Sequence, residues 1–104
     1  NLPLLLLQAR EAMMRRFRQV LKRHRLTDQQ WRVMRSLAES GSMTSSDIAR
    51  ECCMLGPSLT GVLNRMEAAG WVERARSAKD QRRVAIRLSA AGRSLVARVM
   101  PEVE

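Results

Sequence analysis

The hydrophobic pattern of this chain changes period at Gly70 and changes back after Leu88. Up to Gly70, apolar residues recur every three or four positions, which predicts amphipathic helices. Beyond it, residues 71–75 and 84–88 alternate apolar and polar side chains, which predicts two strands joined by a polar link. Helical spacing then resumes. The chain of 104 residues is long enough for one domain, so the pattern predicts a mainly α domain with a small β-hairpin.

Each predicted helix starts at a residue that favours a helix N-terminus. These residues are Pro3, Thr27, Thr44, Pro57 and Ser89. We expect one helix over 1–25, a helix-turn-helix unit with its hairpin over 27–92, and the start of a last helix over 93–104, the remainder of which we expect to be missing. Pro101 lacks a backbone N–H group, so it is expected to kink or end that last helix.

The charge of the chain is high and unevenly spread. Nineteen Lys and Arg against ten Asp and Glu give a net charge of +9, just beyond the ~2–8 that is usual for a small domain. Residues 1–25 and 71–92 carry most of this excess, whereas residues 41–70 are slightly acidic. Basic zones are typical of nucleic-acid binding, although a solvated surface or an anionic membrane would also explain them.

Several classes of protein are disfavoured by what the sequence contains. The apolar run from Leu4 to Leu7 is far shorter than the ~20 residues of a membrane span. Cys52 and Cys53 are adjacent, so they cannot form the disulfides that stabilise small secreted domains. This favours a protein of the reducing cytoplasm. His24 is the single histidine and has no partner at ligand or triad spacing, so we expect no metal, no cofactor and no enzymatic activity.

Two short helices followed by a hairpin describe a winged helix-turn-helix, in which the second helix of the pair enters the major groove of DNA. The spacing places Leu59, Val62, Leu63 and Met66 on the inner face of that helix. The residues left on its outer face are Pro57, Ser58, Thr60, Gly61, Asn64 and Arg65. Small hydrogen-bonding side chains and one Arg suit contact with base edges, and glycine permits a close approach. The alternative is an ordinary solvated face.

The link between the two predicted strands offers a second DNA contact. Arg82 and Arg83 suit a minor groove, whose negative potential attracts Arg most strongly where the groove is narrow. Asp80 is expected to pair with Arg82 and fix its direction. A loose polar turn is the alternative.

Three further residues suggest a site for a small aromatic acid. Arg10 lies within the apolar stripe of the first helix, and a buried Arg is costly unless it is paired with an anion. Trp31 and Arg35 lie one turn apart on the second helix and combine an aromatic plane with a guanidinium, which suits a planar carboxylate. Alternatively, Arg35 pairs with Glu39, Trp31 is plain core, and Arg10 pairs across a dimer interface.

A family resemblance supports this interpretation. The stretch from Asp80 to Gly92 (DQRRVAIRLSAAG) resembles the wing signature of MarR-type regulators, in which Asp-x-Arg precedes a strand and then Leu-Ser/Thr-x-x-Gly. Residues 8–12, 27–32 and 57–63 are similar to the homoprotocatechuate-degradation repressors and hydroxyphenylacetate-responsive regulators of that family. The resemblance covers nearly the whole chain.

The resemblance implies a cytoplasmic homodimer, built from the first and last helices, that binds a pseudo-palindromic operator in double-stranded DNA. It implies a repressor that a small phenolic or aromatic carboxylate releases. Carried over by position, Pro57, Ser58, Thr60, Asn64 and Arg65 fall on the recognition helix, Asp80 and Arg82 on the wing, and Arg10, Trp31 and Arg35 on the effector pocket.

Two further features of the sequence bear on this interpretation. Relatives often have Arg where this chain has Gly56, so its operator preference could differ. Some MarR-type proteins also respond to oxidants through a thiol, and Cys52 and Cys53 are the candidates for that alternative.

Overall fold

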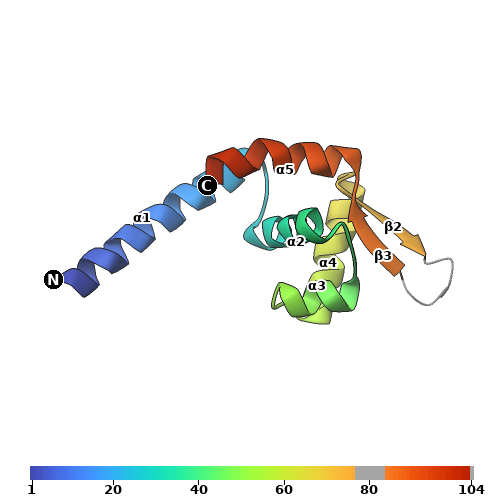
Figure 1. Cartoon of the computed structure of the whole chain (residues 1–104), viewed down its shortest axis with the longest axis horizontal. Helices are drawn as coiled ribbons and strands as arrows, with labels where there is room; N and C mark the ends of the chain where they lie inside the picture. The colour runs from blue at the N-terminus through green and yellow to red at the C-terminus, as the bar shows by residue number, and fades with distance from the viewer. Residues whose placement is uncertain (77–83, 104) are drawn as a thin grey trace.

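The fold is a small antiparallel sheet packed against a group of helices (Figure 1). The computed structural model describes residues 1–76 and 84–103, and only the backbone of Arg76. Within that part of the chain, the elements in order are α1 (Leu2–Arg23), α2 (Asp28–Ser40), β1 (Ser42–Thr44), α3 (Ser45–Glu51), α4 (Gly56–Ala68), β2 (Val72–Arg76), β3 (Val84–Leu88) and α5 (Ala90–Val103). The predicted helices and the two hairpin strands are all present, so the winged helix-turn-helix fold is confirmed.

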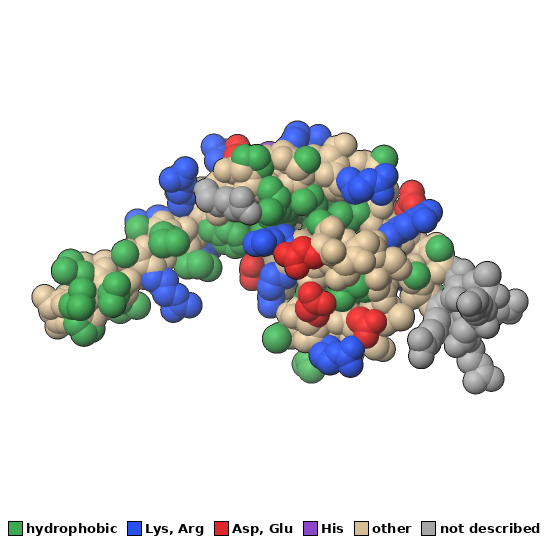
Figure 2. Space-filling view, in the orientation of Figure 1, with side chains coloured by type: hydrophobic (Ala, Val, Ile, Leu, Met, Phe, Trp, Pro, Cys, Tyr) green, Lys and Arg blue, Asp and Glu red, His purple; other side chains and the backbone are tan. Residues whose placement is uncertain are grey.

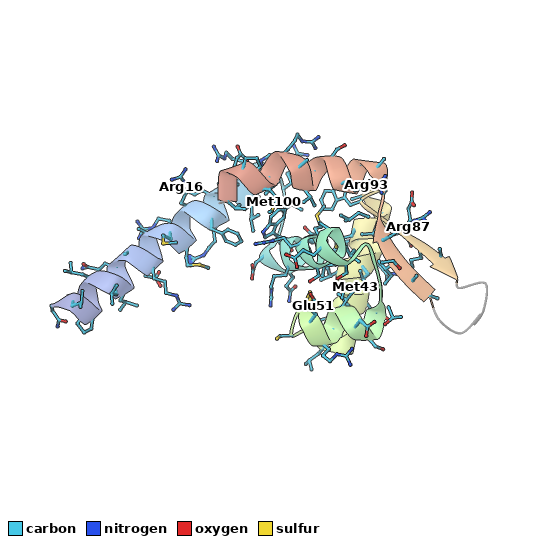
Figure 3. The ribbon with its side chains drawn as sticks, in the orientation of Figure 1. Arg16, Met43, Glu51, Arg87, Arg93 and Met100 are labelled. Atoms are coloured by element: carbon cyan, nitrogen blue, oxygen red, sulfur yellow. The ribbon has the colours of Figure 1, made fainter. Side chains whose placement is uncertain are left out.

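The sheet contains one strand that the sequence did not predict. Its order is β1-β3-β2, with both pairings antiparallel. Met43 of β1 lies opposite Ile86 of β3 and points into the core (Figure 3). Three residues are too few to show an alternating pattern, so β1 is extended because β3 supplies its hydrogen-bonding partner.

The core lies where α2, α3 and α4 meet the sheet and α5. The largest fully buried side chains come from nearly every element and include Met34, Ile48, Met66, Ile86 and Val99. Apart from Trp31, aliphatic and thioether side chains make up most of this core, because the chain has only three aromatic residues.

The helix ends follow the predicted signals. The Thr27 hydroxyl accepts from the Gln30 backbone N–H and the Gln30 side chain accepts from the Thr27 backbone N–H, which completes a capping box. Gly70 has a φ of 81°, and the N–H groups of Gly70 and Trp71 donate to the carbonyls of Glu67 and Met66. This is a Schellman motif, which turns the chain out of α4 into β2.

The last helix departs from the prediction at Pro101. Ser89 caps it as expected, because its Oγ accepts from the Gly92 N–H at 3.0 Å. However, α5 continues through Pro101 to Val103, so of the two expected outcomes, a kink or an end, the helix does not end at the proline. Pro101 lies in the last turn, and the carbonyl that it leaves without a partner belongs to Ala97, which is exposed and open to water.

The first helix projects away from the rest of the molecule (Figure 1). The radius of gyration is 15.7 Å, against ~13 Å for a compact domain of this length. Only Phe17, Val20 and Leu21 of α1 pack against the core. The end of α1 is also joined to α5, because the His24 side chain at the C-cap bonds to the Glu102 carboxylate.

Candidate DNA-binding and effector sites

Helix α4 presents the outer face that its sequence predicted. Leu59, Val62, Leu63 and Met66 are all buried. The candidate base-reading residues Pro57, Ser58, Thr60, Asn64 and Arg65 are exposed, and Gly61 is half-buried. The inner and outer faces therefore agree with the expected assignment.

Two of these residues have local contacts that bear on whether they can contact DNA. The Thr60 hydroxyl donates to the carbonyl of Gly56 at 3.0 Å, so its oxygen remains free to accept. A Cβ added to Gly61 would lie 3.7 Å from Arg65 Nη2, which is an ordinary contact. The fold therefore does not require glycine at position 61, although glycine in a helix interior costs about 1 kcal/mol relative to alanine.

One residue beside the outer face of α4 was not predicted from the sequence. Arg74 of β2 donates from Nη2 to Asn64 Oδ1 at 2.9 Å, and its Nε lies 3.5 Å from Glu67 Oε2. The signal was available, because period-2 alternation places Arg74 on the same face of β2 as the buried Val72. Arg74 also lines a cavity of about 420 Å³ between α3, α4 and the sheet, together with Ser45, Thr60, Leu63, Val84 and Ile86.

The wing contacts can be placed only in part. The strands β2 and β3 pair as far as Arg76 and Val84, which face each other in the register. Asp80, Arg82 and Arg83 lie outside the described residues. Their role in DNA binding stays a prediction.

Trp31 and Arg35 come together at one groove. This groove has a volume of about 420 Å³ and is also lined by Phe17, Arg32, Ser36, Glu39, Glu51, Cys52 and Cys53. The Trp31 side chain is 2% exposed and belongs to the core, so it offers the groove a small part of its surface. Arg35 is exposed, and its Nη2 lies 3.6 Å from Glu39 Oε1. Both the core role of Trp31 and the Arg35–Glu39 pair are therefore present beside the groove.

Arg10 is not part of this groove. It is exposed on the projecting half of α1, so the expected burial among apolar side chains is not met within one chain. The reason is that, among residues 1–76 and 84–103, no side chain covers the stripe around it. Apolar side chains gather on this end of α1 in Figure 2. Leu2 and Met13 of the same helix are 68% and 72% exposed.

The two cysteines differ in environment. Cys52 is buried at the C-cap of α3, and its Sγ lies 3.4 Å from the Ser36 hydroxyl. Cys53 is exposed and has a φ of 56°. Arg32 donates to the Cys52 carbonyl at 3.0 Å, which ties α2 to the end of α3. Both thiols are free.

Two further properties concern metals and membranes. Among residues 1–76 and 84–103, no three His, Cys, Asp or Glu side chains are grouped so that they could hold a metal ion. None of the helices in that part of the chain is both long enough and apolar enough to cross a bilayer.

Comparison with known proteins identifies the family. The model of the MarR family matches residues 26–84, which include the helix-turn-helix and β2 and end at Val84, the first residue of β3. This chain belongs to the MarR family. MarR proteins are transcriptional regulators rather than enzymes.

Relatives within the MarR family cover most of this chain. It is 50% identical over 104 residues to the homoprotocatechuate degradative operon repressor of Escherichia coli, a match that spans 100% of this chain and 70% of the repressor. It is 48% identical over 99 residues to the HTH-type transcriptional regulator FarR of Neisseria gonorrhoeae, spanning 95% and 68% of the two chains. The resemblance to homoprotocatechuate-degradation repressors is thus confirmed.

Solved MarR-family structures agree with the fold. The structure of NadR in complex with 4-hydroxyphenylacetate superposes with a TM-score of 0.85 at 47% identity, covering 99% of this chain and 73% of NadR. A MepR variant from S. aureus has a TM-score of 0.93 at 24% identity, covering 97% and 75%, and supports the fold alone.

Proposed function

We propose that this MarR-type regulator represses an aromatic-acid catabolic operon and leaves its operator when a small phenolic or aromatic carboxylate binds. The single observation that carries the proposal is the outer face of α4, which exposes Ser58, Thr60, Asn64 and Arg65 beside a glycine that the fold does not require. A helix that inserts into a major groove gains from such a glycine, which offsets its cost to the fold.

The wing supplies the second DNA contact in this proposal. Arg82 and Arg83 enter the minor groove, and Asp80 orients Arg82 through an ion pair. The basic composition of residues 71–92 supports this assignment, because phosphate and minor-groove contacts both favour positive charge. Double-stranded DNA with a pseudo-palindromic sequence is the expected partner.

The homodimer is supported by the exposed apolar residues of α1. Seven Leu and Met side chains between Leu2 and Met14 are exposed in the single chain. Contiguous apolar surface of this kind favours association with a second copy. Such a partner would also surround Arg10, which then becomes available to an anion held between α1 and the groove at Trp31.

The effector site proposed here combines Arg10, Trp31 and Arg35. The exposed guanidinium of Arg35 can bind a carboxylate bidentately, and the apolar side chains of Phe17 and Trp31 line the same groove for the ring. The bound 4-hydroxyphenylacetate in NadR, which is 47% identical to this chain, supports an acid of this class.

A gel-shift titration tests the proposal. The full chain is titrated onto DNA from upstream of its own gene, with and without 4-hydroxyphenylacetate and related acids. We expect the protein to shift the DNA into a slower-moving complex, and we expect the acid to dissociate that complex. Arg35→Ala should bind DNA normally and respond weakly to the acid, whereas the matched variant Arg98→Ala, which changes an exposed Arg on α5, should respond like the wild type.

Two negative outcomes separate the parts of the proposal. Failure to bind any palindrome in that region would overturn the repressor assignment. A complex that no aromatic acid affects would overturn the effector site and leave the DNA-binding assignment standing. A third outcome is that peroxide dissociates the complex and that Ser at both cysteine positions prevents this effect. The regulator would then respond to oxidation of a thiol instead of to an acid. The exposed Cys53, which lines the same groove, is the observation that favours a thiol mechanism.

A further inference from the structure

Arg74 links the first strand of the hairpin to the exposed face of α4. Its guanidinium donates to Asn64 Oδ1 at 2.9 Å and lies 3.5 Å from the Glu67 carboxylate. Asn64 and Glu67 are three positions apart, so they are neighbours on one face of the helix. One side chain of β2 therefore holds two side chains of the helix that is proposed to read DNA.

The contact determines how the Asn64 amide is oriented. A guanidinium can only donate, so the end of the amide that faces Arg74 must be the oxygen. The NH2 group is then directed away from β2. Reversal of the amide would place two donors face to face and lose a charge-assisted hydrogen bond, so the orientation is held in the free protein.

The Glu67 carboxylate holds Arg74 in place. It accepts only, it lies on the Nε side of the guanidinium, and it offsets the positive charge beside Asn64. Arg74 is 35% exposed and Glu67 is 48% exposed, and pairs at such exposed positions contribute little to folding stability. Stability is therefore a weak reason for this arrangement, and the orientation of Asn64 is its clearest consequence.

Resting on the proposed function, in which α4 enters the major groove, we propose that Arg74 is a positioning residue that determines which base-edge group Asn64 reads. An amide that can place both ends against one base pairs bidentately with adenine N6 and N7. With its oxygen held by Arg74, Asn64 presents N–H donors to the groove. It then reads an acceptor such as guanine O6 or N7, or thymine O4, in place of the bidentate adenine pair.

The test measures base preference at each position of the bound DNA. The full chain is bound to a pool of randomised duplexes, and the bound fraction is sequenced. The proteins compared are the wild type, Arg74→Met, Asn64→Ala and the double variant. Arg74→Met should change the preference at the position that Asn64→Ala affects, by roughly fivefold or more and toward adenine. The double variant should match Asn64→Ala alone, because Arg74 acts through Asn64.

Arg87 provides the matched control. It projects from β3 (Figure 3) and pairs with Glu73 of β2 at 3.2 Å, so it too is an Arg paired with a Glu, but this pair lies within the sheet and does not touch α4. Arg87→Met should leave the preference at the Asn64 position unchanged. If Arg74→Met fails to fold, Glu67→Gln takes its place, because it loosens the same guanidinium and should weaken the preference at the same position.

Other outcomes overturn the inference. If Arg74→Met weakens binding to all sequences equally and lowers the salt dependence, Arg74 contacts phosphate instead. The inference is also overturned if both Arg74→Met and Glu67→Gln keep the base preference of the wild type. In that case the proposed function still stands, as long as the wild type binds DNA selectively. Absence of selective binding by the wild type overturns the proposed function and this inference together.

Discussion

Gly92 and Trp71 are in direct contact, because the first turn of α5 lies against the carbonyl group that precedes β2. A Cβ added to Gly92 would lie 2.1 Å from the Trp71 carbonyl oxygen, which no real side chain can occupy. The same carbonyl accepts from the Ser89 N–H at 2.9 Å. The glycine of the Leu-Ser-x-x-Gly motif is therefore required by packing between α5 and the turn that leaves α4.

Gly92→Ala should destabilise the chain by about 1–3 kcal/mol, because the backbone at Trp71 must shift to admit the methyl group. Urea unfolding measures this loss. Gly56→Ala is the matched control, since a Cβ there meets nothing within 4 Å, and it should change stability by less than about 0.5 kcal/mol. Equal stability of the two variants would contradict the close contact.

Substitution of Trp31 and substitution of Arg35 should have very different effects on the free energy of unfolding, although both residues are proposed to contact the effector. Trp31 is 2% exposed in the core, so Trp31→Ala should cost about 3–5 kcal/mol. Arg35 is exposed and paired with Glu39, so Arg35→Ala should cost no more than about 0.5 kcal/mol. Thermal or urea unfolding tests this, and a large loss in Arg35→Ala would show that its role is structural.

The His24–Glu102 contact predicts a dependence of stability on acid pH. The hydrogen bond from His24 lowers the pKa of Glu102 below its ordinary value, the charges of His24 and Arg23 lower it further, and desolvation opposes them. Because this pKa is lower in the folded than in the unfolded chain, the stabilisation is complete above the ordinary value of ~4.3 and is lost as the pH falls through the folded value.

The measurement is an NMR titration of the Glu102 carboxyl group, accompanied by urea unfolding against pH. In the wild type, the carboxyl should titrate below its ordinary range, and the stability gap to Glu102→Gln should close as the pH falls below about 4. His24→Asn should return the pKa of Glu102 toward its ordinary value. An unchanged titration in that variant would contradict the assigned cause.

The two cysteines should react at different rates with a thiol reagent. Cys53 is exposed and Cys52 is 4% exposed, so the native chain should react rapidly at one thiol and at the second only on unfolding. Cys53→Ser should remove the rapid phase, whereas Cys52→Ser should retain it. Rapid modification of Cys52 would show that the end of α3 opens in the native state.

Much of the fold follows from local signals. Thr27, Thr44 and Ser89 define helix starts, and Gly70 defines the end of α4, because caps and left-handed turns depend on residues close in sequence. Pro101 was expected to kink or end α5, and the helix does not end there. A proline costs a helix one backbone bond, and in a last turn with an exposed Ala97 carbonyl, water can offset that loss.

By itself, the sequence determined the order of the elements, the inner and outer faces of α4, and the family, because these depend on spacing within short segments. Only the tertiary structure decided that β1 joins the sheet, that Arg10 is exposed in one chain, and that Arg74 holds Asn64. Each of these depends on a partner remote in sequence. Ser42–Thr44 needs β3 as its hydrogen-bonding partner, and the stripe around Arg10 needs a surface that the described residues do not supply. Arg74 meets Asn64 only because the turn at Gly70 folds β2 back along α4.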